Sequence, residues 1–354
     1  MPQLVGALRG GYPSGTEEQV VKLNRILRPA RSRGVLLPAL AVLAAGATAP
    51  LYASGVAEAP GPAPADTRGR ITVSAAIDTE GALLGSLIAL VLADNGFRVD
   101  DRIGLGPADV VRRAALDGEV DIYPDYTGNG ALWFDEAGTA VWRNAAAGYE
   151  RVRALDMESN GLVWLSPAPA SNSRVIAVRS ELAGAGVRTM EDIGPWMAEG
   201  NRFTLAVGEA LASRPDGLPA FEEAYGFRLD PQDLRIVPGG ASTAALQALA
   251  GEAAEAAEAA EVSAAMAYGT DAGIAALGLH VLEDTRRVQP VYRPAPVVRS
   301  EILERYPQVE RLLQPVFAQL SGDVLRALNA AIAVDGRSAR DVAGQYLSEN
   351  GFID

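Results

Sequence analysis

From residue 70 onward the chain alternates short β-branched runs with longer helical patterns, and this order constrains the fold most strongly. Repeated strand-then-helix order is typical of an α/β fold with largely parallel sheets. About 285 residues of this pattern exceed a comfortable single hydrophobic core, so we expect two lobes. The predicted strands cover residues 71–75, 120–123, 174–178 and 204–207, and the predicted helices cover residues 80–95 and 107–117.

The N-terminal residues have the pattern of an export signal. Five basic side chains lie between residues 22 and 33, and an apolar run at about 35–46 follows them. Small residues come next, which completes the order of regions in a secretory signal peptide. A membrane-spanning helix needs about 20 apolar residues, so permanent anchoring is the weaker interpretation. We therefore expect residues 1–59 to be a leader, residues 60–69 a linker, and the mature protein to be periplasmic.

Composition removes several classes of chemistry. The chain has no cysteine, which excludes thiol catalysis, Cys-bound zinc and disulfides. Its one histidine, His280, lies in an apolar run, where a structural role is the commoner one. The net charge is −13 and no basic cluster follows the leader, which argues against a nucleic-acid partner. We expect no metal and no cofactor, and any enzymatic chemistry would have to depend on carboxylates or tyrosines.

Three segments carry the most specific pattern in the chain. They are IDTEGALLG at residues 77–85, GEVDIYPDYTGNG at residues 118–130 and AMAYGTD at residues 265–271. In this order and spacing they resemble the osmoprotectant-binding proteins of ABC importers, which take up solutes such as glycine betaine, choline and carnitine. The similarity covers residues 70–354 and is greatest to the subgroup induced by osmotic stress.

The resemblance implies a type II periplasmic-binding-protein fold, in which two α/β lobes joined by two crossovers enclose the ligand in a cleft. We expect the crossovers near residues 173–179 and 292–298. Lobe 1 then combines residues 70–174 with 293–354, and lobe 2 holds residues 175–292. The resemblance also implies an inner-membrane ABC permease and its ATPase as partners. We expect a monomer without enzymatic activity.

The ligand's chemistry indicates which side chains to look for. A quaternary ammonium cannot donate a hydrogen bond, so it binds to the faces of aromatic rings, whereas a betaine carboxylate favours an arginine fork. By resemblance, Tyr126 and Tyr268 match cage rings, Thr127 matches a residue near the ligand head, and Arg214 matches the arginine that grips the carboxylate. From composition alone, half-buried packing explains each tyrosine and a surface ion pair explains Arg214.

Two positions depart from the family pattern. Many relatives have Ser-Lys where this chain has Ala75-Ala76, and that lysine helps to hold the carboxylate. Relatives also have an aromatic residue in the crossover, where this chain has Arg174. A cation there weakens quaternary-ammonium binding by charge repulsion, unless it replaces the missing lysine as a carboxylate partner or points to solvent. Asp78 and Trp133 complete the candidate ligand contacts.

Three other functions stay open at this point. A binding protein of the same fold for a more anionic or amino-acid-like solute would use Arg174 and Arg214. A hydrolase would need two carboxylates such as Asp125 and Glu80, but Glu80 near a helix start is better explained by the helix dipole. A periplasmic solute sensor would signal without transport. The sequence favours delivery of a glycine betaine-like solute to an ABC transporter.

Overall fold

The computed structural model describes residues 68–354 except 215–216, 238–241 and 251–261. The leader, nearly all of the predicted linker and the alanine-rich run at 251–261, which is expected to form an exposed helix, lie outside the described residues. Residues Gly69–Asp354 form one compact unit. Among the helices that are described, none combines the length and the apolar character needed to cross a membrane.

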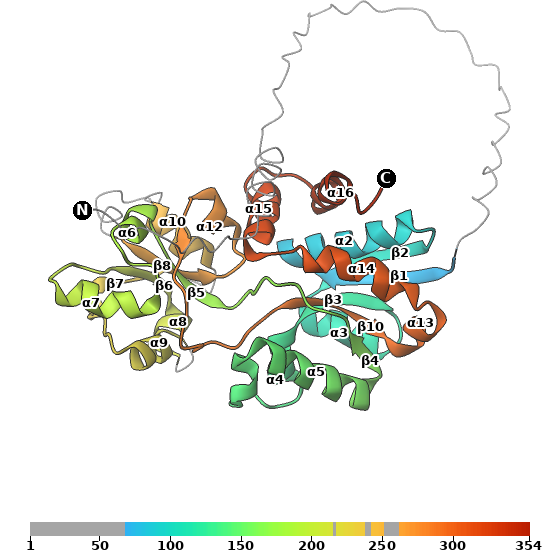
Figure 1. The fold of residues 1–354 in the computed structure, drawn as a ribbon, viewed down its shortest axis with the longest axis horizontal. Coiled ribbons are helices and arrows are strands. Elements are labelled where there is room, and N and C mark those ends of the chain that lie inside the picture. The colour runs from blue at the N-terminus through green and yellow to red at the C-terminus, as the bar shows by residue number, and fades with distance from the viewer. Residues whose placement is uncertain (1–67, 215–216, 238–241, 251–261) are drawn as a thin grey trace, which may run out of the picture. The chain divides into compact units, whose positions relative to one another are not determined.

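The first sheet contains five strands in the order β2-β1-β3-β10-β4 (Figure 1). Strand β1 pairs in parallel with β2 and β3, and β10 runs antiparallel to β3 and β4. The strands are β1 (Arg70–Ala76), β2 (Arg98–Gly106), β3 (Ile122–Tyr126), β4 (Leu162–Trp164) and β10 (Pro294–Arg299).

Helices cover both faces of the first sheet (Figure 1). Strands β2 and β3 lie on opposite sides of β1, so connections of the usual right hand place α2 and α3 on opposite faces. Helix α2 is apolar around most of its circumference, since it packs between the sheet and helices α14, α15 and α16. The helices are α2 (Thr79–Asp94), α3 (Ala108–Leu116), α4 (Gly130–Trp133), α5 (Ala145–Asn160), α13 (Ser300–Arg305), α14 (Gln308–Ala318), α15 (Gly322–Ala333) and α16 (Ala339–Glu349).

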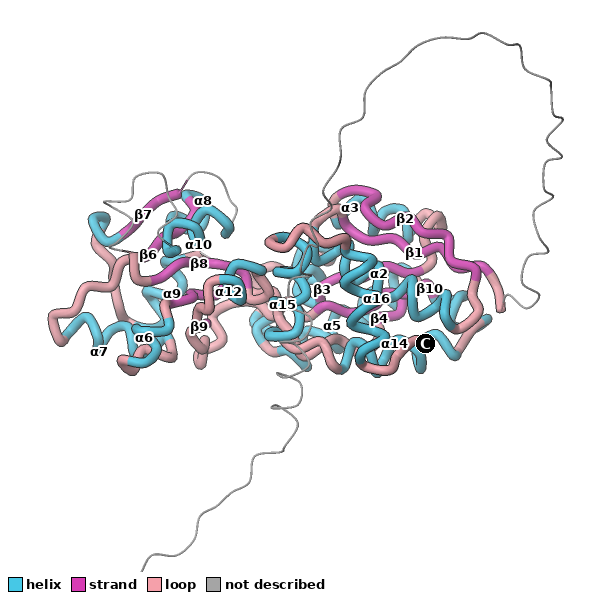
Figure 2. Tube along the Cα trace, turned by 90° about the horizontal axis from the view of Figure 1, so that it is seen from above, coloured by secondary structure: helices cyan, strands magenta, loops and turns pink. Residues whose placement is uncertain are grey.

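The second sheet repeats this plan in the order β7-β6-β8-β5-β9 (Figures 1 and 2). Strand β6 is parallel to β7 and β8, and β5 is antiparallel to β8 and β9. The strands are β5 (Arg174–Val178), β6 (Leu205–Gly208), β7 (Leu234–Val237), β8 (Ala264–Tyr268) and β9 (His280–Val281). The helices are α6 (Ser180–Gly184), α7 (Ile193–Ala198), α8 (Glu209–Ser213), α9 (Leu218–Tyr225), α10 (Ser242–Ala250) and α12 (Ala272–Ala276).

The expectation of largely parallel sheets is wrong, because each sheet has two parallel and two antiparallel pairings. The register gives the reason. Pro294, which begins β10, pairs with Tyr126, which ends β3, so the chain returning from the second sheet enters beside a strand end and runs backwards. Strand β5 enters the second sheet in the same way, with Arg174 opposite Tyr268.

Strand β2 is not among the strands that the sequence predicts. It lies at the edge of the first sheet and carries charged side chains that hide the apolar alternation, including Arg98, Asp100, Asp101 and Arg102. Charged residues are common on edge strands, where they discourage pairing with another chain.

A buried ion pair joins three elements beside the first sheet. Arg112 of α3 and Asp156 of α5 are 6% and 0% exposed, and two nitrogens of the guanidinium bind both carboxylate oxygens at 3.0 and 2.7 Å. Trp164 Nε1 and Asn160 Nδ2 donate to the same carboxylate, each at 2.7 Å. These bonds compensate for the desolvation of both charges.

Replacing Arg112 by Met leaves the Asp156 carboxylate buried without its counter-charge. We expect the free energy of unfolding to fall by about 3–5 kcal/mol, measured by urea denaturation. The control is Arg113→Met on the exposed side of the same helix, for which we expect a change within about 0.5 kcal/mol. Equal losses in the two variants would contradict a stabilising role for the buried pair.

Candidate functional site

Strand ends from both sheets meet around a cavity of about 250 Å³. Tyr126 ends β3 of the first sheet, whereas Tyr268 ends β8 and Arg174 begins β5 of the second sheet. Asn129 from the turn after β3, together with Asn172 and Tyr292 from the two connections between the sheets, completes the wall. The lining residues are Tyr126, Asn129, Asn172, Arg174, Tyr268 and Tyr292. Three tyrosines and one arginine therefore face a space suited to a small solute.

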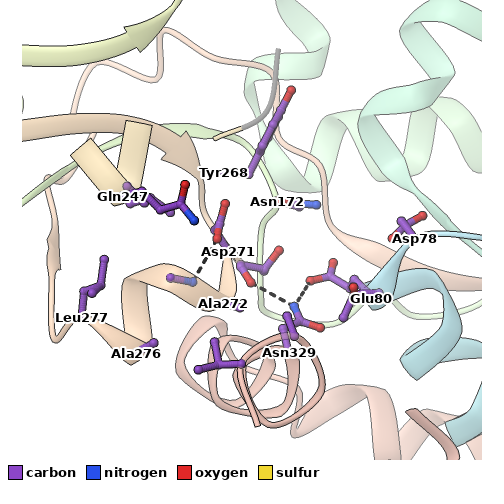
Figure 3. Close-up of a pocket in the computed structure, with 16 residues that line it drawn as sticks. Asp78, Glu80, Asn172, Gln247, Tyr268, Asp271, Ala272, Ala276, Leu277 and Asn329 are labelled. Carbon is purple, nitrogen blue, oxygen red and sulfur yellow. Dashed lines mark hydrogen bonds between the residues drawn. The ribbon is translucent and has the colours of Figure 1, made fainter. Parts of the chain in front are cut away.

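A second cavity of about 680 Å³ adjoins the first and shares Asn172 and Tyr268 with it (Figure 3). Among the described residues, its lining includes the carboxylates of Asp78, Glu80 and Asp271 and neither lysine nor arginine. The lining of the smaller cavity has an arginine and no carboxylate. Negative and positive side chains thus line two different, neighbouring cavities.

Tyr126 is held by its hydroxyl group. The hydroxyl donates a hydrogen bond of 2.5 Å to Glu80 Oε1, and the side chain of Asn172 also bonds to Tyr126. Burial, together with the charge of Glu80, raises the pKa of Tyr126 well above its usual value, so the phenol stays neutral and remains a donor. Two partners at its far end fix the ring in place against the cavity.

The turn after β3 is organised by Asp125, which is 2% exposed. Its Oδ1 accepts hydrogen bonds from the backbone nitrogen of Tyr126 and from Asn129 Nδ2, both at 2.7 Å. Trp133 Nε1 donates to Oδ2 at 3.3 Å. A Cβ on Gly128 would lie 2.7 Å from the ring of Tyr292, so glycine lets the turn pack against that ring. These contacts explain the local sequence from Asp125 to Asn129.

The structure brings three of the predicted ligand contacts together in the smaller cavity, namely Tyr126, Tyr268 and Arg174. Asp78 lines the adjoining cavity, where its side chain also caps α2 by accepting a hydrogen bond of 2.9 Å from Gly81 N. Their roles toward a ligand stay predictions.

Three other predicted contacts do not line either cavity. Thr127 is 1% exposed, and its hydroxyl donates to Val291 O at 3.0 Å and accepts from the backbone of the second connection. Trp133 is half-buried beneath the site, with the Arg112 guanidinium 5.2 Å from its ring centroid. Arg214 is exposed and follows the end of α8. Thr127 and Trp133 thus support the turn that carries Tyr126.

Sequence reasoning missed Asn129, Asn172 and Tyr292 in the smaller cavity. Asn172 Oδ1 is buried and has no hydrogen-bond partner among the residues described. Asn172 lies just before β5 and Tyr292 just before β10. Tyr292 lies in the predicted crossover at 292–298, and Asn172 lies one residue before the one at 173–179. A rule that flags polar and aromatic residues within and next to the predicted crossovers would have found both, because both connections pass the cavity.

Comparison with known proteins shows the family to which the chain belongs. Residues 69–349 match the substrate-binding domain of ABC-type glycine betaine transport systems. The chain belongs to this family. It is 47% identical over 283 residues to the glycine betaine-binding protein YehZ of Escherichia coli, covering 80% of this chain and 91% of that protein. It is 31% identical over 315 residues to the glycine-betaine-binding protein of Pseudomonas aeruginosa, covering 87% and 94%.

Solved structures give the same fold. Apo YehZ from Escherichia coli superimposes with a TM-score of 0.75 at 46% identity, covering 80% of this chain and 99% of that chain. A glycine betaine/carnitine/choline ABC transporter structure has a TM-score of 0.71 at 19% identity, covering 80% and 100%. The predicted family and the two-lobed type II fold are confirmed, and the chain is a solute-binding protein of ABC transport.

The buried Asp125 makes stability depend on pH. Burial raises its pKa from 3.8 to about 6, so the folded protein holds this proton more tightly than the unfolded chain. The resulting stabilisation is present below about pH 4 and is lost as the pH rises through 6. Relative to Asp125→Asn, we expect the wild-type free energy of unfolding to fall by about 2.4 kcal/mol from pH 4 to pH 7 in urea titrations. A difference in unfolding free energy between the wild type and Asp125→Asn that does not change with pH would contradict a raised pKa of Asp125.

Proposed function

We propose that this chain is a periplasmic protein that binds glycine betaine or a closely similar zwitterion and delivers it to an inner-membrane ABC permease and its ATPase. It acts as a monomer and catalyses no reaction. The observation that carries this proposal is the lining of the smaller cavity, where three tyrosine rings and one guanidinium surround about 250 Å³. The two relatives named for glycine betaine support the same solute class.

The rings supply the attraction for a quaternary ammonium. Each ring face that a cation desolvates contributes roughly 1–2 kcal/mol, so two or three rings together give useful affinity. Asn172 Oδ1, which has no partner within the described structure, is an acceptor for the polarised methyl hydrogens of such a cation. The three carboxylates of the adjoining cavity further favour a cation on that side.

Arg174 supplies the other half of a zwitterion site. Its Nη1 donates a hydrogen bond of 2.9 Å to Gln289 Oε1, and Gln289 is 5% exposed, so the guanidinium is anchored at the wall. Arginine stays charged in proteins and binds carboxylates well. Choline brings a second positive charge to this cavity without a carboxylate, whereas glycine betaine offsets its ammonium with an anionic end beside Arg174. We therefore place the ligand carboxylate at Arg174 and the ammonium toward Tyr126 and Tyr268.

Binding without turnover fits the state of the two carboxylates considered for a hydrolase. Asp125 accepts three hydrogen bonds and does not line either of the two cavities. Glu80 accepts hydrogen bonds from Tyr126, Asn329 and Thr270. Neither carboxylate is arranged to exchange a proton with a solute in the smaller cavity. Export through the predicted signal peptide fits a periplasmic receptor.

The aromatic contribution is tested by calorimetric titration of residues 67–354, which include the whole compact unit Gly69–Asp354, with glycine betaine. We expect saturable binding that Tyr126→Ala and Tyr268→Ala each weaken at least tenfold, since tenfold in Kd is about 1.4 kcal/mol. Tyr149→Ala, which removes a tyrosine outside the lining of both cavities, is the control. Binding that survives both cavity variants would overturn the aromatic site.

The charge arrangement is tested with three ligands of nearly equal shape. Choline lacks the carboxylate of glycine betaine, and 3,3-dimethylbutyrate lacks its positive charge. We expect Arg174→Gln to weaken glycine betaine at least tenfold and to leave choline unchanged or tighter, because it removes the carboxylate partner and the repulsion together. Arg113→Gln makes the same charge change at an exposed site.

Two outcomes would redirect this proposal. If Arg214→Gln rather than Arg174→Gln selectively weakens the carboxylate ligands, the carboxylate lies at Arg214. If 3,3-dimethylbutyrate binds the wild-type protein as tightly as glycine betaine, the solute class is anionic, which Arg174 in a cavity lined without carboxylates would favour.

A further inference from the structure

Helix α15 packs against α2, which covers the first sheet, and against α12, which follows β8 of the second sheet (Figures 1 and 2). Its Asn329 makes the most direct connection. Asn329 Nδ2 donates a hydrogen bond of 2.6 Å to Glu80 Oε2 in α2 and one of 2.9 Å to the backbone oxygen of Thr270, which follows β8 (Figure 3). Glu80, Thr270 and Asn329 are 6%, 2% and 5% exposed and line the larger cavity, so these bonds lie at its nearly buried wall.

The same carboxylate extends the connection to the cavity wall. Glu80 Oε1 accepts the hydrogen bond from the hydroxyl of Tyr126, and the side chain of Thr270 also bonds to Glu80. The result is a buried relay from Tyr126 through Glu80 and Asn329 to Thr270, two residues beyond Tyr268. Both tyrosine walls of the smaller cavity are therefore tied to one carboxylate.

A second contact of α15 holds the neighbouring carbonyl. Arg326 Nη1 donates a hydrogen bond of 2.6 Å to Gly269 O, so the helix binds two consecutive carbonyls of the segment that follows Tyr268. On its other side this segment lies against the first connection between the sheets, since a Cβ on Gly269 would come 2.3 Å from Ser171 O. The position of the Tyr268 segment is thus fixed from two sides.

We propose that Glu80 and Asn329 are positioning residues that hold the Tyr126 ring and the Tyr268 segment at a fixed separation across the solute cavity. This role rests on the proposed function for its effect on affinity. A carboxylate is unfavourable in a buried place unless donors surround it. Burial raises the pKa of Glu80, and the hydrogen bonds from Thr270, Tyr126 and Asn329 oppose that shift. The relay orders the rings before the solute arrives, which lowers the entropy lost on binding.

The relay is tested first without a ligand. The chain has no cysteine, so Asp109→Cys in α3 and Glu181→Cys in α6, both exposed, allow spin labels to be attached to the two lobes. We expect a narrow distance distribution by electron paramagnetic resonance, broadened or displaced by Asn329→Ala. Asn350→Ala is the control, because its amide donates to Tyr346 O of its own helix. An unchanged distribution in Asn329→Ala overturns the proposal.

Affinity for glycine betaine then separates positioning from folding. Tyr126→Phe keeps the ring and removes its anchor, and Asn329→Ala removes the other end of the relay. We expect each change to weaken binding about fivefold and the double variant to lose no more than about tenfold, because both act through Glu80. Losses that multiply to about 25-fold, or an affinity unaffected by Asn329→Ala, would overturn the proposal.

Failure of the proposed function gives a different result. If the wild-type protein binds none of glycine betaine, choline and 3,3-dimethylbutyrate, the proposed solute is wrong. The distances between the spin labels still show whether Glu80 and Asn329 fix the two walls of the cavity. Urea denaturation of each variant checks that it is folded. Tyr126→Phe, which retains the ring and deletes one oxygen, provides the measurement if Asn329→Ala proves unfolded.

Discussion

The site depends on a constraint of connectivity: the chain passes between the two sheets and enters each of them beside a strand that has just ended. Pro294 begins β10 opposite Tyr126, and Arg174 begins β5 opposite Tyr268. Antiparallel entry therefore brings strand ends and connections to one place. The cavity residues come from these strand ends and from the connections beside them. Residues that are far apart in the sequence therefore meet at the cavity, and no long loop is needed to bring them there.

The charges around this place follow a division between the two cavities. Arg174 faces the smaller cavity, and carboxylates line the adjoining one. A site for a simple cation would gain from carboxylates on every side, and a site for a simple anion would gain from several arginines. Separation of the two signs suits a solute that carries both, because each end then finds the opposite charge and its total charge stays near zero. Under the proposed function, Arg174, at a position where the family pattern has an aromatic residue, is expected to favour a zwitterion over choline.

The sequence predicted the strands and helices that are strongly patterned and failed where tertiary context decides. Residues 174–178 form the predicted strand, since a β-branched apolar run fits a buried strand on both faces. Strand β2 was missed because charges on an edge strand hide its alternation. Tyr126 and Tyr268 were found from their motifs, and the structure places both at the cavity. Thr127 lies in the same motif, yet its hydroxyl binds Val291 O, because a hydroxyl beside a crossing chain satisfies that chain's backbone.

Glu80 shows why spacing could not identify the remaining parts of the site. A glutamate in the first turn of a helix is well explained by the helix dipole, and an exposed position would require nothing more. Only the fold reveals that α15, about 250 residues further along the chain, covers this carboxylate and supplies Asn329. Because Glu80 is buried, its carboxylate needs hydrogen-bond donors. Those donors are Tyr126 on one side of the cavity, Thr270 on the other, and Asn329 of α15. Glu80 lines the larger cavity and not the smaller one, and its two oxygens accept hydrogen bonds from Tyr126 and Asn329, so the fold makes it a partner of the wall rather than of a solute held between the three tyrosines.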